Sequence, residues 1–272
     1  MSAAEVHCGE EPPLIKGAGS GTVFLSGCIA ACCFCQNYQI SRLRIGRPVS
    51  PDILADCFLD LQKKGCSNLN WVTPTPHLPF LLKALAIAME QGLNLPLVYN
   101  CNGYMNPGIL KKLDGIVDIY LPDMKYGQDV WAETFLGLPD YTRINAETVR
   151  EMYRQVGCLV LDDRGAAVSG LLIRHLVLPD NTAGTAAVLK TIAAIDPDIP
   201  LSLMAQYRPC YEALGHPVLG RGLHREEFEA AVELLEIYGI THAYVQSAEA
   251  LQRKDGYFPD FSRDPGQIFD QD

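Results

Sequence analysis

The sequence predicts an α/β fold built on a parallel sheet. Strand-like and helix-like stretches alternate along most of the 272 residues, and such alternation is typical of βαβ units. Several strand candidates are continuous apolar runs, as expected when helices cover both faces of a sheet. The chain is 48% hydrophobic, which at this length is enough for one large domain with a full core.

The predicted elements follow one another in a regular order. Strand candidates are residues 22–26, 68–72, 95–100, 117–121, 171–178, 201–206 and 243–246. Helical patterns lie between them, at residues 51–64, 79–91, 106–113, 146–156, 185–195 and 225–238. Ser50 is the expected N-cap of the first helix, with Pro51 at its first position, and Asn145 is the expected cap of the fourth. The pattern alone leaves open whether the sheet is doubly wound or closes into a partial or full barrel.

Three cysteines follow the first strand candidate at the spacing C-x3-C-x2-C: Cys28, Cys32 and Cys35. Three thiolates on one tight loop can ligate three irons of a [4Fe-4S] cluster and leave the fourth iron open, whereas a structural cluster or zinc site normally recruits a fourth residue. Zinc sites usually show two separate C-x2-C pairs, and this sequence has no second pair. Cys33 lies in the same loop at the wrong spacing, so we interpret it as a neighbour of the ligands. The spacing favours a cluster over buried cysteines that act as small apolar side chains.

The cysteine loop resembles the signature of the radical S-adenosylmethionine (SAM) superfamily, C-x3-C-x-aromatic-C, with Phe34 as the aromatic residue. Residues 19–28 and 35–38 resemble the uncharacterised pyruvate formate-lyase activating enzyme-like branch. The similarity continues through residues 73–75, 99–104, 118–126 and 174–179. Many members of that branch carry a cysteine-rich segment ahead of the motif Gly9 to Pro13. This chain starts almost at that motif, so we expect the segment to be absent or truncated.

The resemblance implies a partial (β/α)6 barrel of parallel strands over residues 21–250, between an N-terminal extension (1–20) and a C-terminal tail (251–272). The cluster loop would lie at the carboxyl ends of the strands, where parallel barrels place their chemistry. The implied cofactors are a [4Fe-4S] cluster and SAM, which is cleaved reductively to a 5′-deoxyadenosyl radical that abstracts a hydrogen atom. A flavodoxin- or ferredoxin-type protein would donate the electron. The implied substrate is a glycine of a partner glycyl-radical enzyme, and a small molecule or peptide is the alternative.

Two charged residues are implied to contact SAM. By resemblance, Lys125 and Arg174 bind its carboxylate and ribose side, and Asp123 helps to bind a monovalent cation. Arg174 stands in an otherwise apolar run, where a charge is costly unless it is paired. A buried Asp123–Arg174 ion pair without a ligand is therefore the alternative.

Polar residues follow other strand candidates as well. Asn100 and Asn102 can hydrogen-bond a ribose or a carboxylate, although a simple Asn102-Gly103 turn explains Asn102 equally well. Thr73 and Thr75 stand where the superfamily often has Gly-Gly-Glu; they can offer oxygens to the SAM ammonium, or form a rigid turn. Gln206 follows the sixth strand and is expected to reach SAM or the substrate.

Composition excludes several function classes. The net charge of −10 argues against general nucleic-acid binding, which depends on basic surfaces. No apolar run approaches the roughly 18 residues that a membrane span needs. Ten cysteines without a signal peptide predict a reducing compartment, the cytoplasm. Two competing classes remain: an iron–sulfur electron carrier or redox sensor with Cys33 or Cys101 as a fourth ligand, and, less well supported, a zinc-binding structural protein.

Overall fold

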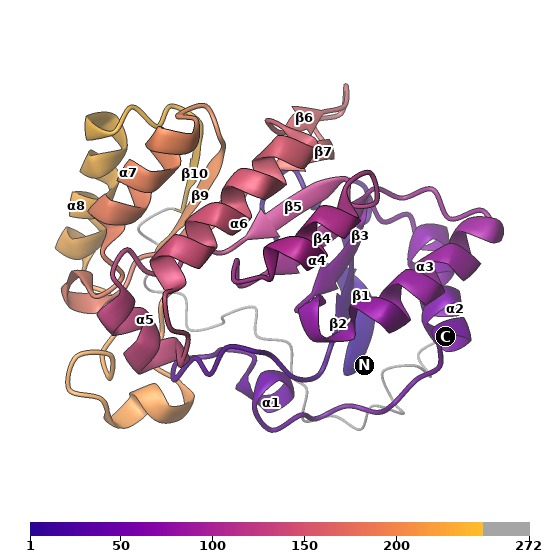
Figure 1. Cartoon of the computed structure of the whole chain (residues 1–272), viewed down its shortest axis with the longest axis horizontal. Helices are drawn as coiled ribbons and strands as arrows, with labels where there is room; N and C mark the ends of the chain where they lie inside the picture. Colours follow the sequence, from indigo (N-terminus) through magenta and orange to yellow (C-terminus); the bar gives the residue numbers. More distant parts are fainter. Residues whose placement is uncertain (247–272) are drawn as a thin grey trace.

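The computed structural model describes residues 1–246 and confirms an α/β fold (Figure 1). Its strands are β1 (Ala3–His7), β2 (Ser20–Phe24), β3 (Leu69–Val72), β4 (Leu97–Cys101), β5 (Ile119–Pro122), β6 (Val160–Leu161), β7 (Ala167–Leu171), β8 (Ile173–Leu176), β9 (Leu201–Met204) and β10 (Ala243–Val245). The larger sheet has the order β1-β2-β3-β4-β5-β7-β6, and the smaller one β10-β9-β8. All pairs are parallel except β1 with β2 and β6 with β7, at the two edges of the larger sheet.

The two sheets are joined where β7 gives way to β8. The predicted single strand over 171–178 is interrupted at Leu172, whose side chain is fully buried. Beyond this break Asp123 forms a parallel bridge with Arg174, and the Met124 N–H donates to the Arg174 carbonyl at 2.8 Å. Apart from the antiparallel edge strand β6, the strands from β2 to β10 are therefore parallel and lie in chain order, with one bend between β7 and β8. This arrangement confirms the partial barrel that the family resemblance implied.

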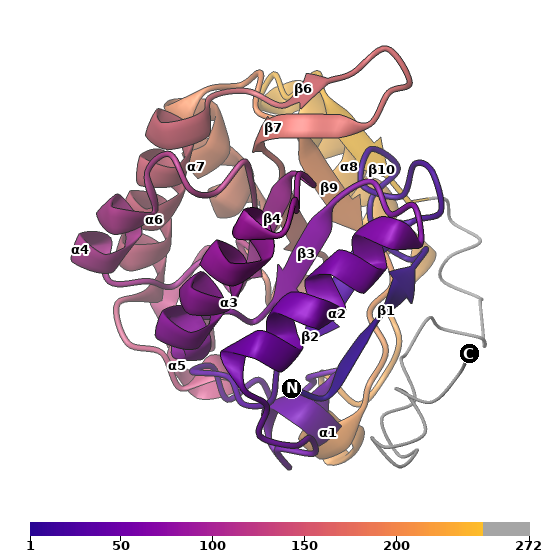
Figure 2. The same cartoon turned by 90° about the vertical axis from the view of Figure 1, so that its right-hand side faces the viewer.

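Most of the helices cover the outer faces of the two sheets, and two short ones lie near the carboxyl ends of the strands (Figure 1). The helices are α1 (Tyr38–Ser41), α2 (Pro51–Lys63), α3 (Leu78–Glu90), α4 (Pro107–Leu110), α5 (Asp129–Leu136), α6 (Tyr141–Val156), α7 (Thr185–Ile195) and α8 (Arg225–Ile237), with short 3-10 turns η1 (Thr75–His77), η2 (Lys111–Leu113), η3 (Pro179–Asn181) and η4 (Tyr211–Gly215). Figure 2 shows α2 and α3 side by side in front of β2 and β3. Within the described chain, no helix combines the length and the apolar composition of a membrane span.

Helix caps confirm one prediction and correct another. Ser50 caps α2, since its hydroxyl accepts from the Ile53 N–H at 3.3 Å, and Pro51 occupies the first position. Asn145, by contrast, is not a cap. The helix α6 begins four residues earlier, at Tyr141, and Asn145 lies buried within it. The prediction was wrong because a polar residue before a helical pattern usually caps the helix, whereas the Asn145 amide bonds residues that are distant in the sequence.

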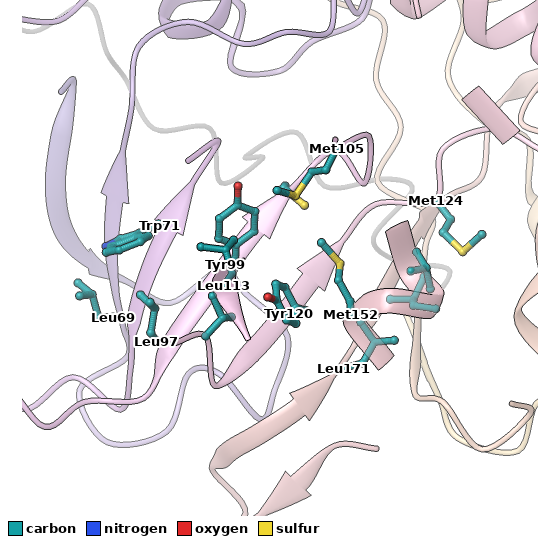
Figure 3. Packing of buried hydrophobic residues seen from close by; sticks show 14 of the residues in the cluster. Leu69, Trp71, Leu97, Tyr99, Met105, Leu113, Tyr120, Met124, Met152 and Leu171 are labelled. Carbon is teal, nitrogen blue, oxygen red and sulfur yellow. The ribbon is translucent and has the colours of Figure 1, made fainter. Parts of the chain in front are cut away.

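Side chains of the strands alternate between an outer and an inner environment. Tyr99 of β4 packs in the main core between sheet and helices, and Figure 3 shows it near Tyr120 and Leu113. Its neighbour Val98 belongs instead to a separate inner cluster of Leu14, Val98, Ile119, Leu121, Ala167 and Leu172. Asn100 lies two residues after Val98 in β4, so its side chain points to the same inner face of the sheet. The inside of the barrel is thus apolar at the amino ends of these strands and polar at their carboxyl ends.

Residues 1–20, which the sequence predicted as an extension, contribute to the barrel. The strand β1 pairs with β2, and the following segment passes inside the fold. Leu14 is fully buried there, and its carbonyl accepts from Asn68 Nδ2 at 2.7 Å and from Ser67 Oγ at 2.8 Å. The segment therefore closes the barrel at the amino ends of the strands. The predicted tail, residues 251–272, lies outside the described residues.

Candidate active site

A cavity of about 210 Å³ opens at the carboxyl ends of the parallel strands. It is lined by the loop after β2 and by residues at or beyond the ends of β3, β4, β5, β8 and β9. The sequence-predicted residues that line it are Cys28, Cys32, Phe34, Cys35, Thr73, Asn100, Asn102, Asp123, Lys125, Arg174 and Gln206. Thr75 does not line the cavity. It lies in η1, with Oγ1 3.0 Å from the Tyr99 hydroxyl. One cavity thus collects residues that are almost 180 positions apart in the sequence.

The cysteine loop forms the first wall. It has no regular structure between β2 and α1, and neighbouring elements hold its backbone. The Ala31 and Cys33 N–H groups donate to carbonyls at the end of α5, at 2.7 and 3.1 Å, while the Cys33 carbonyl accepts from the Ala213 N–H at 3.0 Å. Cys28, Cys32 and Cys35 line the cavity, whereas the half-buried Cys33 does not. Within the loop, the cavity lining thus separates the three motif cysteines from Cys33.

The surroundings of the thiols fit thiolate ligands of a cluster. The Ala30 N–H and Asn102 Nδ2 donate to Cys28 Sγ at 3.4 and 3.7 Å, and Cys35 Sγ lies 3.1 Å from Ser41 Oγ. Burial raises the pKa of the Cys32 thiol, and the positive charge of Lys125 opposes that rise. A bound metal would supply the remaining positive charge that favours a thiolate. As the side chains stand in residues 1–246, no group of three or more His, Cys, Asp or Glu is arranged to hold a metal ion.

The strand ends form the second wall, a charged network around Asp123. Lys125 Nζ lies 2.7 Å from Asp123 Oδ2, and Arg174 Nε lies 3.0 Å from Oδ1. Arg174 also donates to Asn100 Oδ1 at 2.6 Å and approaches Glu10 Oε2 at 3.4 Å. Burial disfavours the charged form of Asp123, but Arg174 and Lys125 outweigh it and lower the pKa of the carboxyl. The Asp123–Arg174 pair that the sequence left as an alternative is present, and it lines the cavity together with Lys125.

Two buried side chains of α6 support this network and were missed as site residues. Asn145 Nδ2 donates to the carbonyls of Gly103 and Asp123 at 2.9 and 3.0 Å. The Tyr141 hydroxyl accepts from the Lys125 N–H at 2.9 Å. Gly103 has φ +69°, and a Cβ there would lie 2.2 Å from Asn145 Nδ2, so only glycine allows the close approach. No local signal could have identified this contact, because Asn145 and Gly103 are brought together only by the tertiary fold.

His175 lies directly behind the charged wall. Its Nδ1 is 2.6 Å from the Met124 carbonyl and its Nε2 is 3.0 Å from Thr185 Oγ1. Burial lowers the pKa of His175 to about 4, so the ring is neutral near neutral pH. This histidine therefore links the segment after β5 to α7 as a structural residue.

Thr73 adopts an unusual backbone conformation where β3 ends. Its φ is +62°, in the left-handed region that β-branched residues rarely adopt. The Thr73 N–H still donates to the Asn100 carbonyl at 3.0 Å, which extends the pairing of β3 and β4 into the cavity rim. Such strain usually persists at functional sites, where surrounding contacts hold it in place.

Comparison with known proteins gives one relative in sequence and several in structure. No model of a known protein family matches the chain. The chain is 31% identical over 249 residues to an uncharacterized protein of Methanocaldococcus jannaschii, an alignment that covers 88% of this chain and 68% of that protein. A relative of this similarity and coverage shows common family membership.

Solved structures with the same fold are radical SAM proteins. SuiB of Streptococcus suis, bound to S-adenosylmethionine, matches with a TM-score of 0.58 at 8% identity over 86% of this chain and 52% of SuiB. The hydrogenase maturase HydG of Carboxydothermus hydrogenoformans matches with a TM-score of 0.57 at 12% identity, over 85% of this chain and 54% of HydG. The chain spans about half the length of these two proteins. It belongs to the family of the uncharacterized M. jannaschii protein, and it shares its fold with these two solved structures.

Proposed function

We propose that this protein is a radical SAM enzyme that holds a [4Fe-4S] cluster through Cys28, Cys32 and Cys35. The observation that carries the proposal is that these thiols line one cavity together with the polar strand ends. When bound, such a cluster supplies the electron that splits SAM into methionine and a 5′-deoxyadenosyl radical, which abstracts a hydrogen atom from a substrate. The chain's own residues bind and orient SAM and exclude water.

Lys125 is the residue best suited to bind the SAM carboxylate. Its ammonium has three donors, and among the described residues Asp123 is its one ion-pair partner. Its charge also acts on the Cys32 thiol, and both side chains line the same cavity. Arg174 already donates to Asp123 and Asn100, so we assign it the task of fixing the Asn100 amide beside the ligand. The monovalent-cation role of Asp123 remains a prediction.

The substrate of the radical is proposed from two classes. The family resemblance suggests a glycine of a partner glycyl-radical enzyme, and the alternative is a small molecule or peptide. Two fold neighbours were solved with peptides: anSMEcpe with the Cp18Cys peptide and SuiB with its precursor peptide SuiA. These neighbours are the reason to keep a peptide among the substrates to be tested.

A second candidate function is electron transfer without SAM. Cys101 is buried and lines the same cavity as the three motif cysteines, so it is available as a fourth ligand. Burial raises the pKa of the Cys101 thiol to about 12, which opposes ligation by a thiolate until a metal is bound. A cluster with four cysteine ligands would have no open iron for SAM.

One anaerobic experiment separates the two candidates. The cluster is reconstituted, reduced with dithionite and examined by EPR before and after SAM is added, while 5′-deoxyadenosine is quantified. A radical SAM enzyme gives a SAM-dependent change of the spectrum and forms 5′-deoxyadenosine. A spectrum that ignores SAM, without product, would refute the proposal. If the Cys101→Ala variant then also loses its cluster, the electron-carrier function is favoured.

A further inference from the structure

A second cavity, of about 220 Å³, lies next to the first. The two cavities share Arg174, Met204 and Gln206 in their linings. The second one is otherwise lined by the segment between β1 and β2 and by the end of β10, including Glu10, Glu11 and Tyr244. A volume of this size suits a ligand smaller than a drug-sized molecule. A group bound there would share Arg174 with the cavity that the cysteine loop lines.

Glu11 is the unusual residue of this second cavity. Only 8% of its surface is exposed, yet its Oε2 accepts no hydrogen bond from any residue in the described chain. A buried carboxylate oxygen without a donor is costly. Glu10, its neighbour, is better satisfied, because Asn70 Nδ2 donates to it at 3.0 Å and Arg174 lies 3.4 Å away. The Ser202 side chain and the charge of Arg174 favour the Glu11 carboxylate, but its Oε2 accepts from no described residue.

The charges around Arg174 do not balance. Three carboxylates, Glu10, Glu11 and Asp123, surround two cations, Arg174 and Lys125, in the part of the chain that the structure describes. Arg174 is shared between Asp123 and Glu10, and Lys125 is bound to Asp123. Burial accordingly raises the pKa of the Glu11 carboxyl. One positive charge supplied by a ligand would balance the group and give Glu11 Oε2 a donor.

We infer that the second cavity binds the substrate of the radical through one cationic group, an ammonium or a guanidinium, paired with Glu11. The apolar parts of Met204, Tyr244 and Val245 in the lining fit an organic cation with a hydrocarbon body. Arg174, Met204 and Gln206 line both this cavity and that of the proposed SAM site, so the two sites are adjacent. That the bound molecule is the substrate rests on the proposed function, whereas the cation preference rests on Glu11 alone.

The test uses n-hexylamine as probe and the uncharged n-hexanol as its matched comparison, by titration calorimetry on the protein at low ionic strength. Neither iron, SAM nor reductant is needed, so a protein that proves unable to cleave SAM would still give a valid answer. Wild type is expected to bind hexylamine at least about tenfold more tightly than hexanol, the value of one charge-assisted hydrogen bond. Glu11→Gln is expected to lose that preference, while Glu90→Gln, an equal charge change at an exposed position of α3, keeps it.

Three results would overturn the inference. Equal binding of hexylamine and hexanol by wild type would show that the cavity does not select a cation, and this comparison needs no variant to fold. The absence of saturable hexylamine binding would remove the site. A Glu11→Gln variant that unfolds at the wild-type temperature and keeps the full preference would place the cation elsewhere. Any of these outcomes, found with SAM cleavage intact, refutes the substrate inference and leaves the proposed function standing.

Discussion

The two walls of the main cavity are built in different ways. The cysteine wall is a loop without regular structure, held by backbone hydrogen bonds, and its thiols make few polar contacts. The strand-end wall is a closely bonded set of charges, in which Asp123 binds Lys125 and Arg174 and is itself held by Asn145. The protein alone therefore completes the second wall, whereas under the proposed function a metal cluster would supply the positive charge that the first wall lacks.

This difference predicts opposite consequences for function and for stability. A change in the cysteine wall should remove the cofactor and its chemistry while the fold survives. A change in the strand-end wall should destabilise the cluster-free chain, because it leaves buried charges without their ion-pair partners. The following substitutions test that division, from the largest expected effect to the smallest.

Cys32→Ala is expected to abolish SAM cleavage. Cys32 is the most buried of the three motif thiols, and its loss leaves two of the proposed ligands for a cluster that needs at least three. Reconstituted iron content and 5′-deoxyadenosine formation should fall to background, and the far-UV circular dichroism of the cluster-free chain should not change.

Cys33→Ala is the matched control one residue away. Cys33 does not line the cavity, and its backbone groups rather than its thiol anchor the loop. We expect the variant to keep most of its iron and its SAM cleavage. The reverse result, with Cys33→Ala inactive and Cys32→Ala active, would mean that the ligand set is wrongly assigned.

Arg174→Ala is expected to destabilise the cluster-free chain by about 3–5 kcal/mol, since it leaves partners of a buried ion pair without a cation. The side chain of Arg174 is 18% exposed, and its guanidinium contacts both Asp123 and Glu10. Urea unfolding under reducing conditions gives the free energy of unfolding.

Arg225→Ala is the control for this measurement. Arg225 also pairs with a carboxylate, Glu229 at 2.7 Å, but both side chains are more than half exposed. Solvent screens such a pair, so we expect no measurable change in the free energy of unfolding. Equal effects of the two substitutions would show that the charged wall contributes no more to the fold than a surface ion pair.

Sequence reasoning recovered the fold and most of the residues that line the cavity. The alternation of apolar runs is a local property, and the cysteine spacing is a short motif, so both can be read without tertiary information. Lys125 and Arg174 were assigned to SAM through the family resemblance, and Arg174 also stands out as a charge within an apolar run. The Asp123–Arg174 pair was foreseen as an alternative to ligand binding, whereas the Asp123–Lys125 pair was not; all three residues line the same cavity.

The sequence could not reveal the contacts that depend on distant elements. Asn145 has the local pattern of a helix cap, yet it bonds Gly103, which lies 42 residues earlier. Glu10 and Glu11 were noted only as part of a motif, because nothing near them indicates that their segment passes inside the barrel and reaches Arg174, 164 residues after Glu10. The strand β1 and the helix α5 were missed because their patterns are short.

Thr73→Gly is expected to have the smallest effect. It should stabilise the fold and weaken the binding of SAM. Glycine removes the strain of a left-handed β-branched residue, of order 1–3 kcal/mol, but costs about 0.5–1 kcal/mol of backbone entropy, so we expect a net stabilisation of about 1 kcal/mol. If the Thr73 hydroxyl binds SAM, the same variant should bind SAM about fivefold more weakly, the value of one neutral hydrogen bond. Urea unfolding and equilibrium binding of SAM to the reconstituted protein measure the two effects.

Thr75→Gly separates strain from the loss of a hydroxyl. Thr75 has no positive φ, and its hydroxyl lies 3.0 Å from that of Tyr99, so glycine relieves nothing there and should destabilise the chain by about 1 kcal/mol. Because Thr75 does not line the cavity, SAM affinity should change less than in Thr73→Gly. A Thr73→Gly variant that is less stable than wild type would mean that the left-handed backbone stores no strain. The backbone at the cavity rim after β3 would then be unstrained, and no ligand contact would be needed to explain its conformation.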